Sequence, residues 1–258
     1  SEARSRRARA SGGGAPRALK KDDGPTALIN QLDEIERGSG SGVLELPGGH
    51  RLDVSNLRKP FWPKLKLTKG DLLGYYARVA PYILPVLKDR PLIMKRFPNG
   101  VGGPSFYQQR APDKVPPGVR MATLPDDHDV PSRLIGGNLI TLLYMAQLAV
   151  VSQDPWFSRV ASPGMADHCA IDLDPAPGLT FARVLDVARW VRDELETLGV
   201  KGFPKTSGAS GIHVFVPLAP GTPYGAGQIF CQIVATVVSS KHPKVATITR
   251  SVKARGRK

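Results

Sequence analysis

The run AIDLD at residues 170–174 places two carboxylates two positions apart in an otherwise apolar stretch. Alternate residues of a strand point to the same face, so Asp172 and Asp174 project together and the apolar residues between them face the other way. Two convergent carboxylates repel each other unless a cation lies between them, and hard divalent cations prefer oxygen ligands. Pro175 ends the strand and leaves the pair at a sheet edge that a substrate can reach. The run predicts either a divalent-metal site or a pair of carboxylates held by nearby basic side chains.

Basic residues are unevenly distributed along the 258-residue chain, whose formal net charge is +14. Residues 1–21 carry seven Lys and Arg against one Glu, residues 51–110 carry twelve against three Asp, and residues 241–258 carry seven and no acid. The middle cluster lies in sequence of globular character, so the basic character does not depend on the two ends. A polyanion, most commonly nucleic acid, is the expected partner, and a solvated basic face is the alternative. With the paired carboxylates, such a surface suits phosphoryl transfer in which two divalent ions orient a triphosphate.

The cysteine content indicates a reduced compartment, and the longest apolar run indicates that no segment spans a membrane. Cys169 and Cys231 are the only cysteines, and they form no CxxC pair. The longest apolar run, residues 138–151, is too short to span a bilayer and predicts a buried helix capped by Asn138. We therefore expect a cytoplasmic, nucleoid-associated protein with no membrane partner.

Strand and helix signals are intermixed, which predicts an α+β or mixed α/β fold with mixed β-sheets flanked by helices. Residues 1–42 are rich in Arg, Ser and Gly and are expected to be a flexible basic linker, with a short helix conceivable at residues 26–37. Residues 43–258 are expected to form the folded domain. Strands are expected in a hairpin at residues 43–55 and at residues 91–97, 104–110, 169–174 and 212–218. Helices are expected at residues 69–89, capped by Thr68 and broken or kinked near Pro81, and at residues 138–151, 180–199 and 225–240.

A loop of small residues follows the paired carboxylates in the sequence. In KTSGASGIH at residues 205–213, the small residues allow backbone N–H groups to converge on an anion. Lys205 adds a positive charge and Ser207 a hydroxyl donor, while His213 lies on the strand face opposite its apolar neighbours. This stretch is a candidate triphosphate site, and an ordinary Gly/Ser turn with a surface histidine is the alternative.

Two further stretches combine basic residues with structural features suited to nucleic acid. Residues 56–69 hold several lysines in a loop before a helix N-terminus, where charge and free N–H groups both favour an anion; a solvated basic loop is the alternative. Lys95 and Arg96 on one strand, with Phe106 and Tyr107 on the next, suit a backbone contact beside a base-stacking platform. Because adjacent residues face opposite ways, one of the two aromatic rings is expected to lie in the core.

These stretches, in this order, resemble the polymerase domain of the bacterial non-homologous end-joining ligase D, a branch of the archaeo-eukaryotic primase superfamily. The resemblance extends from about residue 50 to the end of the chain. The first metal motif of the family, apolar-Asp-apolar-Asp, matches residues 171–174. Its second motif, small-x-His, matches residues 211–213, preceded by Thr-Ser-Gly at residues 206–208. The resemblance implies a primase-like catalytic core.

The resemblance also implies roles for individual residues. Asp172 and Asp174 would be catalytic and would hold two divalent ions, Mn²⁺ or Mg²⁺. The implied nucleotide-binding residues are Lys95, Arg96, Lys205, Ser207, His213 and Arg255. The implied contacts to a DNA 5′-phosphate are Asn56, Lys59 and Lys69, and the template would stack on Phe106 and Tyr107.

The implied activity is that of a nucleotidyltransferase in DNA repair by non-homologous end joining. A primase-like DNA polymerase of this kind adds nucleotides, preferentially ribonucleotides, to DNA 3′ ends. The implied partners are double-stranded DNA ends or gaps with a 5′-phosphate, NTP or dNTP, a Ku-type end-binding protein and a ligase module.

Three departures from the family pattern create an alternative. The third metal-binding acid of the family follows a basic run, and here that run occupies residues 250–258, where the sequence stops. Asp154 stands where the family often has a histidine, and Ser210 stands where it usually has a lysine. We therefore expect either a domain truncated at its C-terminus or a catalytically deficient module that binds DNA ends. An RNA-binding domain is disfavoured because no RNA-binding signature is present.

Overall fold

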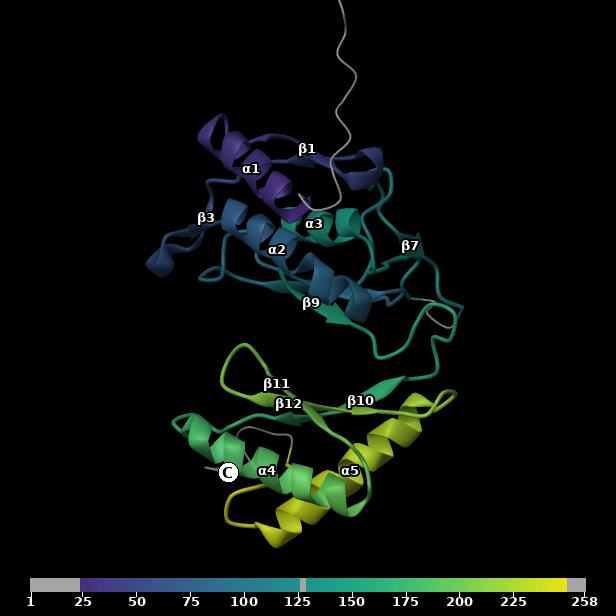
Figure 1. Cartoon of the computed structure of the whole chain (residues 1–258). Helices are drawn as coiled ribbons and strands as arrows, with labels where there is room; N and C mark the ends of the chain where they lie inside the picture. Colours follow the sequence, from purple (N-terminus) through teal and green to yellow (C-terminus); the bar gives the residue numbers. More distant parts are fainter. Residues whose placement is uncertain (1–23, 126–128, 250–258) are drawn as a thin grey trace, which may run out of the picture.

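The computed structural model describes residues 24–125 and 129–249, and these form two lobes of α+β structure (Figure 1). The N-terminal lobe comprises the described residues up to 160, and the C-terminal lobe comprises residues 166–249. Each lobe has its own cluster of buried apolar side chains. The expected α+β class is confirmed, and the two predicted halves of the site lie in different lobes.

A three-stranded antiparallel sheet lies at the face of the N-terminal lobe that is turned toward the other lobe (Figure 1). Its strand order is β6–β5–β9. Its strands are β5 (Leu92–Arg96), β6 (Phe106–Gln108) and β9 (Val150–Pro155). The helices of this lobe are α1 (Gly24–Arg37), α2 (Lys69–Leu87) and α3 (Leu139–Gln147). Three small hairpins complete it: β1 (Gly42–Leu46) with β2 (His50–Val54), β3 (Pro60–Trp62) with β4 (Leu67–Thr68), and β7 (Met121–Ala122) with β8 (Arg133–Leu134).

The C-terminal lobe is a second three-stranded antiparallel sheet with two helices on one face (Figure 1). Its strand order is β10–β12–β11, and its elements are β10 (His168–Leu173), α4 (Phe181–Thr197), β11 (Phe203–Thr206), β12 (Ile212–Pro217) and α5 (Tyr224–Lys241). Alternate strand residues such as Ile171 and Val214 are buried against the helices. The other sheet face is therefore turned toward the N-terminal lobe.

The α2 N-terminus forms as its sequence predicts, but the helix does not break. The Thr68 hydroxyl accepts a hydrogen bond from the Asp71 N–H at 3.2 Å, and the Asp71 carboxylate accepts one from the Thr68 N–H at 2.7 Å. This capping box satisfies two free donors of the first turn. The helix then continues through Pro81 and Pro85 to Leu87, so of the two alternatives, a break or a kink near Pro81, the break is excluded. Packing of its buried face against α1 and α3 offsets the hydrogen bonds that the prolines remove.

Two predicted boundaries need correction. Residues 24–37 of the expected linker form α1, in which Leu28 and Leu32 are each 2% exposed, because apolar residues at helical spacing pack against α2 and β1. Residues 1–23 of that linker lie outside the described residues. The apolar run 138–151 is not one helix: α3, capped by Asn138 as predicted, ends at Gln147. Ala149 then takes a positive φ of 67°, and β9 begins with Val150.

The remaining expected elements are confirmed. The hairpin at residues 43–55 forms as β1 and β2, and the strands expected at residues 91–97 and 104–110 pair as β5 and β6. The strands and helices expected beyond residue 168 form as β10, β12, α4 and α5. Among the described residues, no helix is both long and apolar enough to cross a membrane.

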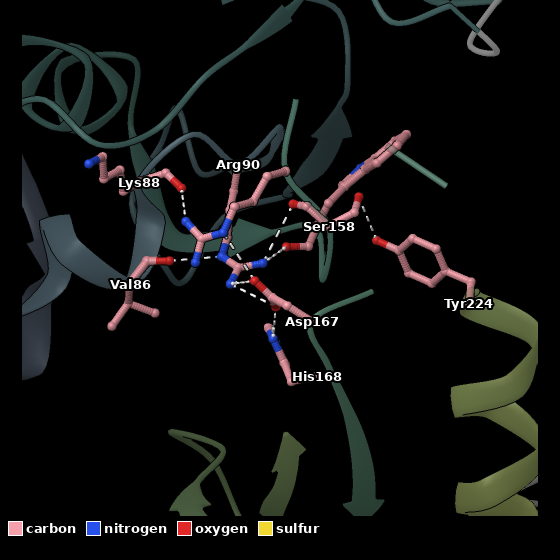
Figure 2. A network of polar contacts seen from close by, with 9 residues as sticks. Val86, Lys88, Arg90, Ser158, Asp167, His168 and Tyr224 are labelled. Carbon is pink, nitrogen blue, oxygen red and sulfur yellow. Dashed lines mark hydrogen bonds and ion pairs between the residues drawn. The ribbon is translucent and has the colours of Figure 1, made fainter. Parts of the chain in front are cut away.

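A network of ion pairs joins the two lobes at the start of β5 and the start of β10 (Figure 2). Arg90, only 5% exposed, donates to both carboxylate oxygens of Asp167 at 2.8 and 2.6 Å and to the carbonyl of Val86 at 2.9 Å. Arg159 donates to the same carboxylate at 3.1 Å, and His168 Nδ1 lies 2.6 Å from it. The network therefore ties together the two strands that carry Lys95 and Asp172.

Candidate functional site

Three of the predicted site residues form one row across the C-terminal sheet. Asp172 of β10 is paired in register with His213 of β12, which is paired in turn with Lys205 of β11. Residues opposite each other in neighbouring strands project from the same face. His213 Nε2 lies 3.4 Å from an Asp172 carboxylate oxygen, and the Asp172 side chain is 61% exposed. The row lies on the sheet face opposite the helices.

Asp174 follows the end of β10 and lies beside this row. Asp172 and Asp174 together line two cavities, one of about 110 Å³ and one of about 590 Å³. Arg183 of α4 also lines the smaller cavity, and Thr247 lines both. Both residues therefore border the same two cavities, which residues of α4 and α5 also line.

The loop between β11 and β12 closes against the end of the carboxylate strand. The Ser207 hydroxyl accepts hydrogen bonds from the Gly211 N–H at 3.0 Å and the Ala209 N–H at 3.3 Å. A Cβ atom at Gly211 would lie 2.5 Å from the carbonyl oxygen of Leu173, so only glycine fits there. This close approach places the loop next to Asp172 and Asp174. Lys205 at the start of the loop is exposed, so its ammonium group can reach an anion.

A second row lies on the facing sheet of the N-terminal lobe. Lys95 of β5 is paired in register with Tyr107 of β6 and with Ser152 of β9. The Lys95 ammonium nitrogen lies 5.4 Å from the centroid of the Tyr107 ring, within the range of a cation–π interaction. This row supplies one positive charge and one exposed aromatic ring.

Asp154 lies between the two rows. Its carboxylate accepts a hydrogen bond from the Ser152 hydroxyl at 3.2 Å. Burial raises the pKa of Asp154, while the Ser152 hydrogen bond and the charges of Lys95 and Lys205 oppose that rise. Lys95 belongs to one lobe and Lys205 to the other, so the Asp154 carboxylate lies within electrostatic range of a cation from each lobe. The sheet of β9 and the sheet of β10, β11 and β12 lie on the facing sides of the two lobes (Figure 1), and cations from both lobes act on Asp154.

The donors present suit a hard divalent cation but do not complete its coordination. Asp172 and Asp174 offer carboxylate oxygens, which are the ligand type that Mg²⁺ and Mn²⁺ prefer. Within residues 24–125 and 129–249, no three or more His, Cys, Asp or Glu side chains are grouped so as to hold a metal ion. An ion at Asp172 and Asp174 would take its remaining ligands from water, from a substrate phosphate or from other residues of the protein.

A separate basic cluster surrounds the N-terminus of α2. Lys69, 6% exposed, donates to the Ser55 carbonyl at 2.9 Å, and Lys59 donates to the Asn99 side-chain oxygen at 3.1 Å. Burial, together with the charges of Lys59 and Arg96, lowers the pKa of Lys69 to about 8. Asn56 lies at the turn before Lys59, with a φ of 57°, and its carbonyl accepts the Lys59 N–H at 3.0 Å. The structure thus brings Asn56, Lys59 and Lys69 together in a setting that favours an anion.

Lys95 and Arg96 are adjacent in the chain but lie on opposite faces of β5. Arg96 donates to the Leu148 carbonyl and to the Gln108 side chain, each at 2.8 Å, and its charge acts on Lys69. Arg96 therefore belongs with the basic cluster at α2, while Lys95 faces the C-terminal lobe. The predicted nucleotide-binding residues are accordingly divided between two regions, and Arg255 lies outside the described residues.

Both aromatic rings of β6 are exposed, so the expectation that one of them lies in the core is wrong. Phe106 is 47% and Tyr107 64% exposed. Strand β6 is an edge strand, and each ring packs against a cation of β5 instead of the core. Tyr107 contacts the Lys95 ammonium group, and the centroid of the Phe106 ring lies 5.5 Å from the guanidinium carbon of Arg96. One ring is thus available on each side of the sheet.

Several residues around the site were not identified from the sequence. Arg90 and Asp167 join the lobes, Ser152 lies in the row of Lys95, and Asn99 holds Lys59. None of them belongs to a motif or a periodic pattern. Their positions follow from contacts between residues far apart in the chain, such as the 77 positions that separate Arg90 from Asp167.

Comparisons with known proteins agree with this arrangement. Residues 68–258 match the family model described as LigD, primase-polymerase domain. The multifunctional non-homologous end joining protein LigD of Mycobacterium bovis is 32% identical over 79% of this chain and 28% of its own length. The bifunctional non-homologous end joining protein LigD of Bacillus subtilis is 31% identical over 80% of this chain and 33% of its own length. The chain therefore spans about a third or less of the length of these relatives.

A solved structure supports the same relationship. The polymerase domain from Mycobacterium tuberculosis ligase D, in complex with DNA, matches with a TM-score of 0.74 and 31% identity. The match covers 80% of this chain and 75% of that domain. With Asp172, His213 and Lys205 in one row of the C-terminal sheet, the chain belongs to the LigD primase-polymerase domain family.

Proposed function

We propose that this chain is a DNA end-joining repair polymerase domain, a primase-like nucleotidyltransferase that extends DNA 3′ ends at breaks or gaps. The observation that carries the proposal is the pair of facing rows, one with Asp172, His213 and Lys205 and the other with Lys95 and Tyr107. Carboxylates on one side and cations on both sides suit a metal-bound triphosphate.

In the proposed reaction, the 3′ oxygen of a DNA primer forms a bond to the α-phosphorus of a nucleoside triphosphate as the bond to pyrophosphate breaks. Two Mn²⁺ or Mg²⁺ ions held by Asp172 and Asp174 would neutralise phosphate charge and favour loss of the proton from the 3′-hydroxyl. Lys205, His213 and the loop at Ser207 would hold the triphosphate, and Lys95 would contact it from the other lobe. Tyr107 would offer a stacking surface for a base.

The cluster of Asn56, Lys59 and Lys69 is proposed to bind the 5′-phosphate of the downstream DNA strand. The side chains of Lys59 and Lys69 lie close enough for their charges to interact, and Lys69 is nearly buried. The cluster and the nucleotide site involve opposite faces of β5, so one DNA gap could engage both. Phe106 lies on the side of Arg96, where template stacking would place a base near this cluster.

The remaining partners are proposals that follow from the relatives. We expect cooperation with a Ku-type end-binding protein and a ligase module, and a cytoplasmic location at the nucleoid, where DNA breaks arise.

Primer extension on a gapped DNA duplex tests the proposed function. We expect Mn²⁺-dependent addition of nucleotides, faster with ribonucleotides than with deoxynucleotides and faster when the downstream strand has a 5′-phosphate than when it has a 5′-hydroxyl. The control is the same gap with Ca²⁺ in place of Mn²⁺. No addition in Mn²⁺ with either sugar, by this chain or by the protein that contains it, would contradict the proposal.

A second candidate is a module that binds DNA ends without catalysis. It is favoured by one observation, the lack of a third acid near Asp172 and Asp174 among the described residues. It predicts tight binding that depends on the 5′-phosphate, without incorporation, so the same extension assay separates the two candidates.

The lowered pKa of Lys69 predicts that 5′-phosphate binding depends on pH. Lys69 is charged below a pH of about 8 and neutral above it, so affinity for the anion falls as pH rises. Between a pH of about 7 and about 9.5 we expect a roughly tenfold loss of affinity for 5′-phosphorylated gapped DNA. Fluorescence anisotropy measures it, with 5′-hydroxyl DNA as the reference.

The variant Lys69→Arg supplies the control for this pH dependence. The arginine guanidinium stays charged over this range of pH, so the affinity of the variant for 5′-phosphorylated gapped DNA should fall much less as pH rises. An equal fall for both proteins, or for 5′-phosphate and 5′-hydroxyl DNA, would assign the effect to another group.

A further inference from the structure

The two cysteines of the chain lie next to each other in the C-terminal lobe. Cys169 of β10 is 5% exposed, and Cys231 of α5 is partly buried in the same apolar cluster. A Cβ atom at Gly227 of α5 would lie 3.3 Å from the Cβ of Cys169, and Cys231 is one helical turn beyond Gly227 on the same helix face. The two thiols are close enough for each to shift the pKa of the other.

The two cysteines also have a common route to solvent. Both line the cavity of about 590 Å³ that Asp172 and Asp174 line. Interaction with the neighbouring Cys231 thiol lowers the pKa of the Cys169 thiol, while burial opposes that change. Cys169 is therefore the better nucleophile of the two, because the thiolate is the reactive form. A small oxidant that enters the cavity can reach both sulfur atoms.

A disulfide bond between the two cysteines would constrain the part of the chain that lies between them. Asp172, Asp174, Lys205, Ser207 and His213 all lie between residues 169 and 231. A covalent bond would close a loop that contains every proposed site residue of this lobe within the described chain. It would also tether the carboxylate strand β10 to α5, on the sheet face opposite the row of Asp172, His213 and Lys205.

We propose that Cys169 and Cys231 are a reversible oxidation site that forms an intramolecular disulfide on exposure to a peroxide. The Cys169 sulfur attacks one oxygen of hydrogen peroxide and the O–O bond breaks, so that oxygen stays on the sulfur as a sulfenic acid and the other oxygen leaves as water. The Cys231 sulfur then attacks the Cys169 sulfur, an S–S bond forms, and the sulfenic oxygen leaves as a second water. The two sulfur atoms lose two electrons in total, and the peroxide gains them.

Treatment of the protein with hydrogen peroxide, followed by thiol alkylation and mass spectrometry, tests the proposal. We expect the intact mass to fall by two hydrogens, both thiols to resist alkylation, and a non-reduced digest to contain the 169–231 cross-linked peptide. A dithiol reductant should restore both free thiols. The cross-link should also raise the melting temperature by at least about 3 °C, since it constrains the unfolded chain.

The variant Cys231→Ser supplies the control. It should gain one oxygen on Cys169 under the same treatment and show no rise in melting temperature. Two outcomes would overturn the proposal: both thiols of the parent protein remain open to alkylation at peroxide doses that oxidise Cys169 in the variant, or the disulfide joins two separate chains. Neither readout requires nucleotide addition, so the test stands apart from the proposed function.

Discussion

Replacing Asp172 by asparagine is expected to reduce Mn²⁺-dependent nucleotide addition by roughly a thousandfold. The change keeps the size of the side chain but removes one of the two carboxylates proposed to hold the ions, and it removes the negative charge facing His213. Primer extension on gapped DNA under single-turnover conditions measures the loss.

Binding to DNA separates a chemical defect from a folding defect in this variant. The basic cluster of Asn56, Lys59 and Lys69 lies in the other lobe, so affinity for 5′-phosphorylated gapped DNA should stay within about twofold of the parent. The matched control is Glu196→Gln, an exposed acid on α4 of the same lobe whose loss should leave extension unchanged. Near-parental extension by Asp172→Asn would remove the role assigned to Asp172.

Replacing Asp167 by alanine is expected to destabilise the protein by about 2 to 4 kcal/mol. The change leaves the guanidinium of Arg90, only 5% exposed, without its carboxylate partner in the junction between the lobes (Figure 2). A buried charge that loses its partner keeps its desolvation cost, which is why the loss exceeds that of a surface pair. Urea unfolding followed by tryptophan fluorescence measures it.

The exposed pair of Arg189 and Asp186 on α4 supplies the matched control. Both side chains are well exposed, so Asp186→Ala should cost no more than about 0.5 kcal/mol. Burial alone would raise the pKa of Asp167, but hydrogen bonds from Arg90 and His168 outweigh it and lower that pKa. The parent should therefore lose this stabilisation as pH falls through the lowered pKa, and Asp167→Ala should not. Equal unfolding midpoints for parent and Asp167→Ala would contradict the role of the junction.

Local patterns explain which elements could be predicted from the sequence. The alternation around Asp172, the Thr68 capping box and the helical spacing in α4 depend on residues close in the chain, so each predicts its own element. The hairpins β3–β4 and β7–β8 were not predicted, because their short strands carry too few residues to show a period. A short helix was allowed at residues 26–37 but placed within a linker, because its flanks are polar and its packing against α2 and β1 is a tertiary contact.

The site was predictable in its residue types but not in its arrangement. Motif spacing identified Asp172, Lys205 and His213, and the register of three strands is what places them in one row. The separation of Lys95 from Arg96 follows from strand alternation together with the position of β5 between two neighbours. The junction at Arg90 depends on pairing across the two lobes, for which a single sequence holds no local signal.

A crystal structure of the protein with gapped DNA, a nucleoside triphosphate and Mn²⁺, with manganese located by its anomalous scattering, tests the central claim most directly. The account predicts manganese between the triphosphate and the carboxylates of Asp172 and Asp174, with His213 and Lys205 contacting phosphate oxygens. A bound triphosphate whose manganese lies away from both carboxylates would contradict it.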